Sequence, residues 1–108
     1  MKLSLAVTVC NEYDEIQRLI PFLIENKRKQ DEVVVLFDQK NGDQKVADYL
    51  RTFSKLPNFQ FWRGYFDDDF AEWKNTLTDY CKGDYIFQID ADEIPHKSLL
   101  TNIPAIIE

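Results

Sequence analysis

The sequence has few of the residues from which disulfide frameworks and zinc sites are built. Its 108 residues include two cysteines, Cys10 and Cys81, and one histidine, His96. Two cysteines are too few for a disulfide framework, so we expect both thiols to be reduced and half-buried. A zinc site is disfavoured because no cysteine lies at ligand spacing from His96. For His96 itself, a surface position at the start of a closing helix is favoured over a metal role beside Glu93.

Long apolar runs and clusters of positive charge are also missing. No stretch approaches the roughly 20 apolar residues needed to span a bilayer, and the N-terminus enters a strand-like segment without a signal-peptide pattern. The formal net charge is -6, and the only basic run is Lys27-Arg28-Lys29. This charge disfavours nucleic acid as a partner. We therefore expect a soluble, cytoplasmic protein with no transmembrane segment.

Strand-like runs alternate with segments of helical apolar spacing along the whole chain. Strands are predicted at residues 3–9, 33–37, 59–62 and 85–89, and helices at about 16–24, 44–54, 70–81 and 99–107. Strands that alternate with helices pair in parallel through right-handed crossovers. With an apolar content of 44%, the pattern predicts one domain over residues 1–108, a Rossmann-like three-layer α/β/α fold with a mostly parallel sheet.

Three carboxylates follow the last predicted strand within four residues. Asp90, Asp92 and Glu93 end an apolar run that we interpret as a buried strand. Carboxylates this close repel one another unless a cation lies between them, and Mg²⁺ and Mn²⁺ prefer such oxygen ligands. The sequence therefore predicts a divalent metal site with nucleotide chemistry. Solvated turn residues are the alternative.

Polar residues also follow the first two predicted strands, where open α/β sheets place their ligands. Val9-Cys10-Asn11-Glu12 comes after the first strand, and Asp38 ends the second. The alternative for Asp38 is a cap on the turn that follows it. Asp67 to Asp69 are interpreted as a solvated loop with Asp69 as a helix N-cap. The apolar side of the third helix, with Phe70, Trp73, Leu77 and Tyr80, is predicted to be core rather than a ligand platform.

With these motifs the chain resembles the family 2 glycosyltransferases, which have the GT-A fold and use nucleotide-diphosphate sugars. It is most similar to the bacterial branch that adds sugars to lipopolysaccharide cores. The resemblance spans residues 3–95 and is carried by Val9 to Glu12, Asp38 with Asp43, Lys74-Asn75, Gly83-Asp84-Tyr85 and Asp90-Ala91-Asp92-Glu93. The turn Gln39-Lys40-Asn41-Gly42 departs from the small acidic turn usual in the family, so the choice of nucleotide is not readable.

The resemblance implies roles for particular residues. The nucleotide-binding residues that it implies are Val9, Cys10, Asn11, Glu12, Asp38, Lys74 and Asp90. The metal ligands that it implies are Asp90, Asp92 and Glu93, with Mn²⁺ or Mg²⁺ as the cofactor. Lys74 would neutralise diphosphate charge, and a solvated surface lysine is its alternative. The implied donor is a nucleotide-diphosphate sugar, by expectation a UDP-sugar.

Family members are generally much longer, and their later part supplies the acceptor site and the catalytic base. The resemblance therefore implies that this chain is the nucleotide-sugar half, and its catalytic base stays unassigned. Sugar transfer or hydrolysis is the first expectation, and a catalytically incomplete binding module is the second. A metal-dependent nucleotidyltransferase or phosphate hydrolase is a third. The apolar segment Leu99 to Ile107 predicts a homodimer, or completion by a partner. The alternative is a compact monomer in which this segment folds back as a helix and covers the sheet.

Overall fold

Four parallel strands form the sheet that organises the protein. In the computed structural model, which describes residues 2–92, these are β1 (Leu3–Val9), β2 (Glu32–Asp38), β3 (Phe59–Gly64) and β4 (Tyr85–Asp90). Their order is β3-β2-β1-β4, and each neighbouring pair is parallel. Val7 at the centre lies opposite Val35 on β2 and Ile89 on β4. The predicted mostly parallel sheet is confirmed.

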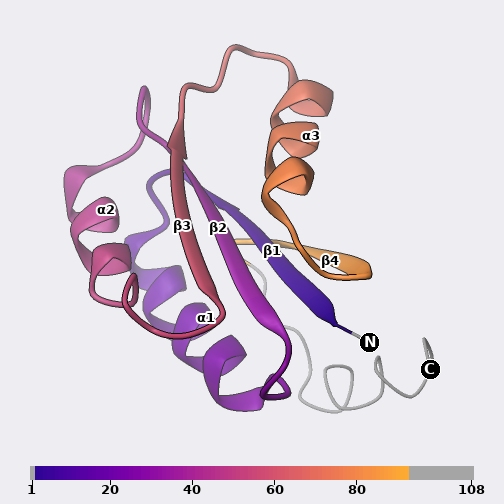
Figure 1. The fold of residues 1–108 in the computed structure, drawn as a ribbon. Coiled ribbons are helices and arrows are strands. Elements are labelled where there is room, and N and C mark those ends of the chain that lie inside the picture. Colours follow the sequence, from indigo (N-terminus) through magenta and orange to yellow (C-terminus); the bar gives the residue numbers. More distant parts are fainter. Residues whose placement is uncertain (1, 93–108) are drawn as a thin grey trace.

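Helices cover both faces of the sheet, as the predicted three layers require. Helices α1 (Tyr13–Asn26) and α2 (Gln44–Arg51) pack on one face, and α3 (Phe70–Tyr80) lies on the other (Figure 1). A hydrophobic core lies on each face of the sheet. Alternate side chains of β1 and β2 pack into one or the other core, because successive side chains of a strand point to opposite faces. The larger core includes Val7 and Val35, and the smaller one includes Val34, Leu36 and Leu77 of α3.

Burial differs sharply between the central strands and β4. All seven residues of β2 are buried, which confirms the interpretation of its continuous apolar run. The prediction of a buried strand at residues 85–89 is wrong. In β4 only Ile89 is buried, while Tyr85 and Ile86 are 42% and 38% exposed. An apolar run indicates a strand but not its place in the sheet, and β4 takes the edge beside β1.

Helix α2 is shorter than the sequence predicts, and the predicted closing helix falls outside the described residues. Helix α2 ends at Arg51, three residues before the predicted end, and single turns continue to Leu56. Glu93, His96 and the segment 99–107 lie outside the described residues, so the single domain over 1–108 and the dimer stay predictions. None of the described helices is long and apolar enough to cross a membrane.

A buried carboxylate joins the strands at their amino ends. Glu32, the first residue of β2, is 1% exposed. Its side chain accepts hydrogen bonds from the Ser4 hydroxyl (2.6 Å), the Lys82 backbone N–H (2.6 Å) and the Gln60 amide (2.8 Å). Burial by itself raises the pKa of Glu32, but these hydrogen bonds outweigh it and hold the pKa below its ordinary value of 4.5. One ionised side chain therefore links β1, β3 and the loop before β4.

We predict that Glu32→Gln lowers the free energy of unfolding at pH 7 by about 1–3 kcal/mol, because charged acceptors make the stronger hydrogen bonds. A depressed pKa stabilises the folded state above the ordinary value and loses that contribution as the pH falls through the folded-state pKa. The difference between wild type and variant should therefore shrink below about pH 4.5. Chemical denaturation at pH 7 and at low pH measures it.

The exposed Glu25 on α1 offers the matched control. Glu25→Gln should change stability little at either pH. An equal loss for Glu32→Gln at both pH values would show that shape, and not ionisation, carries the effect.

Candidate functional site

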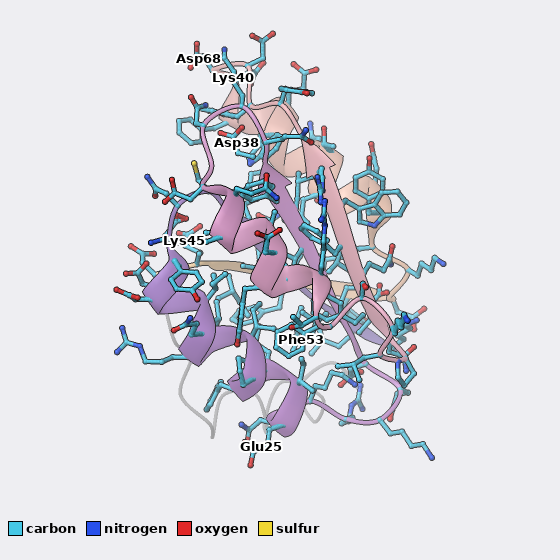
Figure 2. The ribbon with its side chains drawn as sticks, turned by 90° about the vertical axis from the view of Figure 1, so that its left-hand side faces the viewer. Glu25, Asp38, Lys40, Lys45, Phe53 and Asp68 are labelled. Atoms are coloured by element: carbon cyan, nitrogen blue, oxygen red, sulfur yellow. The ribbon has the colours of Figure 1, made fainter. Side chains whose placement is uncertain are left out.

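A cavity of about 530 Å³ opens at the carboxyl ends of β1, β2 and β4, beside α3. Its lining residues are Thr8, Val9, Cys10, Glu12, Asp38, Asn41, Phe66, Phe70, Trp73, Lys74 and Asp90. Figure 2 shows Asp38 just below the loop tips that carry Lys40 and Asp68, at the end of the molecule opposite Glu25. The carboxyl edge of a parallel sheet is the usual place for a ligand. The volume lies in the range of small-molecule sites.

Most of the residues predicted from the sequence meet in this cavity. Those that line it are Val9, Cys10, Glu12, Asp38, Lys74 and Asp90. Asn11 and Asp92 are exposed and are not part of the lining, and Glu93 lies outside the described residues. The structure thus brings six predicted nucleotide-binding residues together from β1, β2, α3 and β4. Their roles toward a ligand stay predictions.

Asp38 holds the loops after β2 and β3 against each other. Its Oδ1 accepts backbone N–H groups from Lys40 (3.0 Å), Asn41 (3.3 Å) and Phe66 (3.3 Å), and its Oδ2 accepts the Asn41 side-chain amide (2.9 Å). Burial raises the pKa of Asp38, but the hydrogen bonds from Asn41, Phe66 and Lys40 outweigh it and leave the pKa below its ordinary value. The turn-capping alternative for Asp38 is therefore present in the structure, and it does not exclude a ligand contact.

The loop after β1 is ordered by Glu12 and contains an unreactive thiol. Glu12 accepts the backbone N–H of Cys10 (3.0 Å) and of Asn11 (3.2 Å). Burial, followed by the charges of Asp38 and Glu12, raises the pKa of Cys10 to about 11. Cys10 and Cys81 are both free and half-buried, as predicted. A thiol that stays protonated at neutral pH is a poor nucleophile, and Cys10 contributes shape to the cavity.

An ion pair closes the far side of the cavity. Lys74 on α3 places its ammonium 3.2 Å from the Asp90 carboxylate at the end of β4. The Asp90 side chain is 60% exposed, so solvent weakens the attraction. The sequence favours two interpretations of Lys74 equally, a cation that binds a diphosphate and a solvated lysine on the helix surface. The structure instead shows Lys74 paired with a predicted metal ligand.

The predicted metal ligands fit a hard divalent cation by their chemistry. Asp90 ends β4, Asp92 follows two residues later, and both are exposed carboxylates. Mg²⁺ binds through one or two carboxylates and fills its shell with water and substrate phosphates. Within residues 2–92, however, no group of three or more histidine, cysteine or acidic side chains is placed to hold a metal. The metal site therefore stays a prediction that rests on Asp90 and Asp92.

Aromatic side chains form a part of the cavity that the sequence analysis missed. Phe66, Phe70 and Trp73, here called the aromatic wall, line it from the β3–α3 loop and α3. Phe70 is 70% exposed, so its assignment to the core is wrong, whereas Leu77 on the same helix is fully buried, as predicted. Helical spacing could not separate them, because Phe70 is the first residue of α3 and lies beyond the sheet surface that Leu77 covers.

Comparisons with known proteins agree with this architecture. The family model described as "Glycosyl transferase family 2" matches residues 4–108. No curated protein matches the chain significantly. Among solved structures, Staphylococcus aureus TarS 1-349 is similar with a TM-score of 0.82 and 19% identity, over 99% of this chain and 32% of that one. The same TarS region in complex with UDP-GlcNAc gives 0.82 and 19%, over 99% and 31%.

A third solved structure is the mannosyltransferase PcManGT from Pyrobaculum calidifontis in complex with GDP-Man and Mn²⁺. It is similar with a TM-score of 0.76 and 20% identity, over 93% of this chain and 30% of that chain. This chain thus spans about a third of the length of these three structures. At such identities the likeness shows a shared fold, and the predicted GT-A-type α/β fold is confirmed.

We predict that Asp38→Ala speeds amide hydrogen exchange at Lys40, Asn41 and Phe66, because each loses its acceptor. The free energy of unfolding should fall by about 1–3 kcal/mol. Exchange measured residue by residue at pH 7 tests both loops at once. The control is Asp43→Ala, because Asp43 is exposed and makes no capping hydrogen bond to α2. Unchanged exchange at Phe66 in Asp38→Ala would contradict the link between the loops.

Proposed function

Because the chain belongs to glycosyl transferase family 2, we propose that its cavity binds a nucleotide-diphosphate sugar together with a divalent cation, as the donor site of a glycosyl transfer. The observation that carries the proposal is the cavity itself. It gathers hydrogen-bonding groups at the ends of β1 and β2 and a cation beside a carboxylate at the end of β4. These are the two chemistries that the base and the diphosphate of such a donor require.

Each end of the cavity suits a different part of the donor. Asn41 and the second oxygen of Asp38 offer polar atoms for the edge of a base at the β2 end. Lys74 can attract the diphosphate, because it brings the ammonium group of the cavity lining to the β4 end. The solved structures with UDP-GlcNAc and with GDP-Man and Mn²⁺ share this fold and support the class of ligand.

Asp90 and Asp92 would hold the divalent cation, Mn²⁺ or Mg²⁺. Such a cation, when bound, supplies charge that stabilises the departing diphosphate. Lys74 lies 3.2 Å from Asp90, so the cation would compete with its ammonium for this carboxylate. A Lys74 side chain released from Asp90 would be free to pair with the diphosphate.

The proposed reaction joins an acceptor hydroxyl to the sugar. The hydroxyl oxygen bonds to the anomeric carbon, the bond from that carbon to the diphosphate breaks, and the nucleoside diphosphate leaves with the electron pair. The hydroxyl proton passes to a base that we do not assign. Binding of the donor without turnover is the second candidate. Hydrolysis of a nucleotide-sugar by the purified chain separates the two.

We predict that a nucleoside diphosphate and Mn²⁺ bind together more tightly than either alone. The carboxylates need a counter-ion, and the diphosphate needs neutralising. Calorimetric titration of UDP and GDP, with Mn²⁺ and with a chelator, measures the synergy. At a hundredfold excess over Kd the folded state gains about 2.7 kcal/mol by mass action.

Asp92→Ala should abolish the Mn²⁺-dependent part of this affinity. The matched control is Asp79→Ala, because Asp79 is exposed on α3 and lies outside the cavity. Nucleotide affinity that is the same with Mn²⁺ and with chelator would refute the metal bridge.

Replacing Lys74 tests the two partners proposed for its ammonium, the diphosphate and Asp90. We predict that Lys74→Met weakens binding of UDP or GDP in the presence of chelator, because a cation beside the diphosphate is lost. The same change should strengthen binding of Mn²⁺ alone, because the ammonium no longer competes for Asp90. Lys82→Met, at an exposed position near the opposite end of the sheet, is the control. A fall in both affinities would contradict the competition.

A further inference from the structure

The aromatic wall contains a large apolar surface that the fold leaves in contact with water. Phe70 is 70% exposed, although Phe66 packs against its ring at a centroid distance of 4.8 Å. Trp73 closes the other side of Phe66 at 5.8 Å and also packs on the smaller core. Phe66 thus contacts both Phe70 and Trp73, while Phe70 itself contributes little to the core. All three line the cavity.

The wall adjoins the polar end of the cavity. The backbone N–H of Phe66 donates to Asp38, which also orders Asn41, so the wall and these polar groups are held in one cluster. At the other end, Trp73 is followed on α3 by Lys74, which pairs with Asp90. A ligand that places its anion near Lys74 therefore has its remaining part beside the wall and the groups around Asp38.

We propose that Phe70, supported by Phe66, stacks on the nucleobase of the bound nucleoside diphosphate. This inference rests on the proposed function and assigns a residue to one part of its ligand. A base has a flat π-face that suits an aromatic ring and polar edges that suit Asp38 and Asn41. The diphosphate has no such face and is matched by Lys74. Because every base has a π-face, the stack adds affinity without choosing the base.

The test compares ligands with and without a base. Calorimetry with UDP, GDP and inorganic pyrophosphate, each with Mn²⁺, is carried out on wild type and on Phe70→Ala. We expect Phe70→Ala to bind UDP and GDP roughly 5- to 100-fold more weakly. Pyrophosphate affinity should be unchanged. Phe70→Tyr keeps the ring and should retain nucleotide affinity.

Tyr65 provides a matched control from the same loop. It is 67% exposed, nearly as much as Phe70, but it does not line this cavity. Tyr65→Ala should leave the affinity for all three ligands unchanged. Thermal unfolding of each variant checks that the fold is retained, as expected for positions this exposed. If Phe70→Ala fails to fold, Phe70→Leu keeps the apolar bulk, removes the π-face and should still lower nucleotide affinity.

The outcomes separate this inference from the proposed function. If wild type binds UDP and GDP and Phe70→Ala binds them equally well, the stack is refuted and the donor site stands. Equal weakening of pyrophosphate also refutes the stack, because the effect then does not involve the base. If Phe70→Ala weakens a nucleotide-sugar but not UDP or GDP, the wall contacts the sugar and the inference is wrong. If wild type binds neither UDP nor GDP, the proposed function fails as well.

Discussion

The burial of β2 on both faces is the constraint on which the rest of the structure depends. Its seven residues are all buried, and its two ends are carboxylates, Glu32 and Asp38. A buried strand can place ionised groups only where neighbours supply hydrogen bonds. Glu32 collects them from β1, β3 and the loop before β4, and Asp38 collects them from the loops after β2 and β3. Each end of the strand therefore organises the chain around it, and the Asp38 end does so at the cavity.

The sequence offers two interpretations for Asp38, a cap on its turn and a contact to a base, and the structure shows the first. An ionised carboxylate has about four lone-pair sites. Three N–H groups use Oδ1, and the Asn41 amide uses one side of Oδ2, while the Cys10 thiol approaches Oδ2 only to 3.9 Å. The thiol makes the longest of these hydrogen bonds, so a donor from a ligand would compete with Cys10 for Oδ2. Asp38 caps its turn, and these hydrogen bonds fix the carboxylate at the position from which the proposed contact to a base would be made.

The sequence predicts the strands and helices well, but it predicts less well which of them are neighbours in the fold. Apolar periodicity placed the four described strands and their parallel pairing, strand ends located five cavity residues, and the family resemblance added Lys74 on α3. It missed the edge position of β4, because an apolar run has the same pattern at the edge as at the centre. It missed the wall and the pairing of Lys74 with Asp90, 16 residues apart, because these contacts arise only when α3 packs on the sheet. Side chains from separate elements that meet at a sheet edge have no common periodicity.

The charge balance of the cavity connects the fold to its proposed chemistry. Glu12, Asp38 and Asp90 line it against the single ammonium of Lys74. Asp38 stays ionised because its pKa is lowered, and the Cys10 thiol stays neutral because its pKa is raised. The lining carries more carboxylates than ammonium groups, so its net negative charge opposes the attraction of Lys74 for a free diphosphate. Under the proposed function, a bound divalent cation would reverse this sign, with Asp92, two residues after Asp90, as a second carboxylate to hold it. The hydrogen bonds that keep Asp38 ionised to order its loops would then also strengthen the dependence of anion binding on that cation.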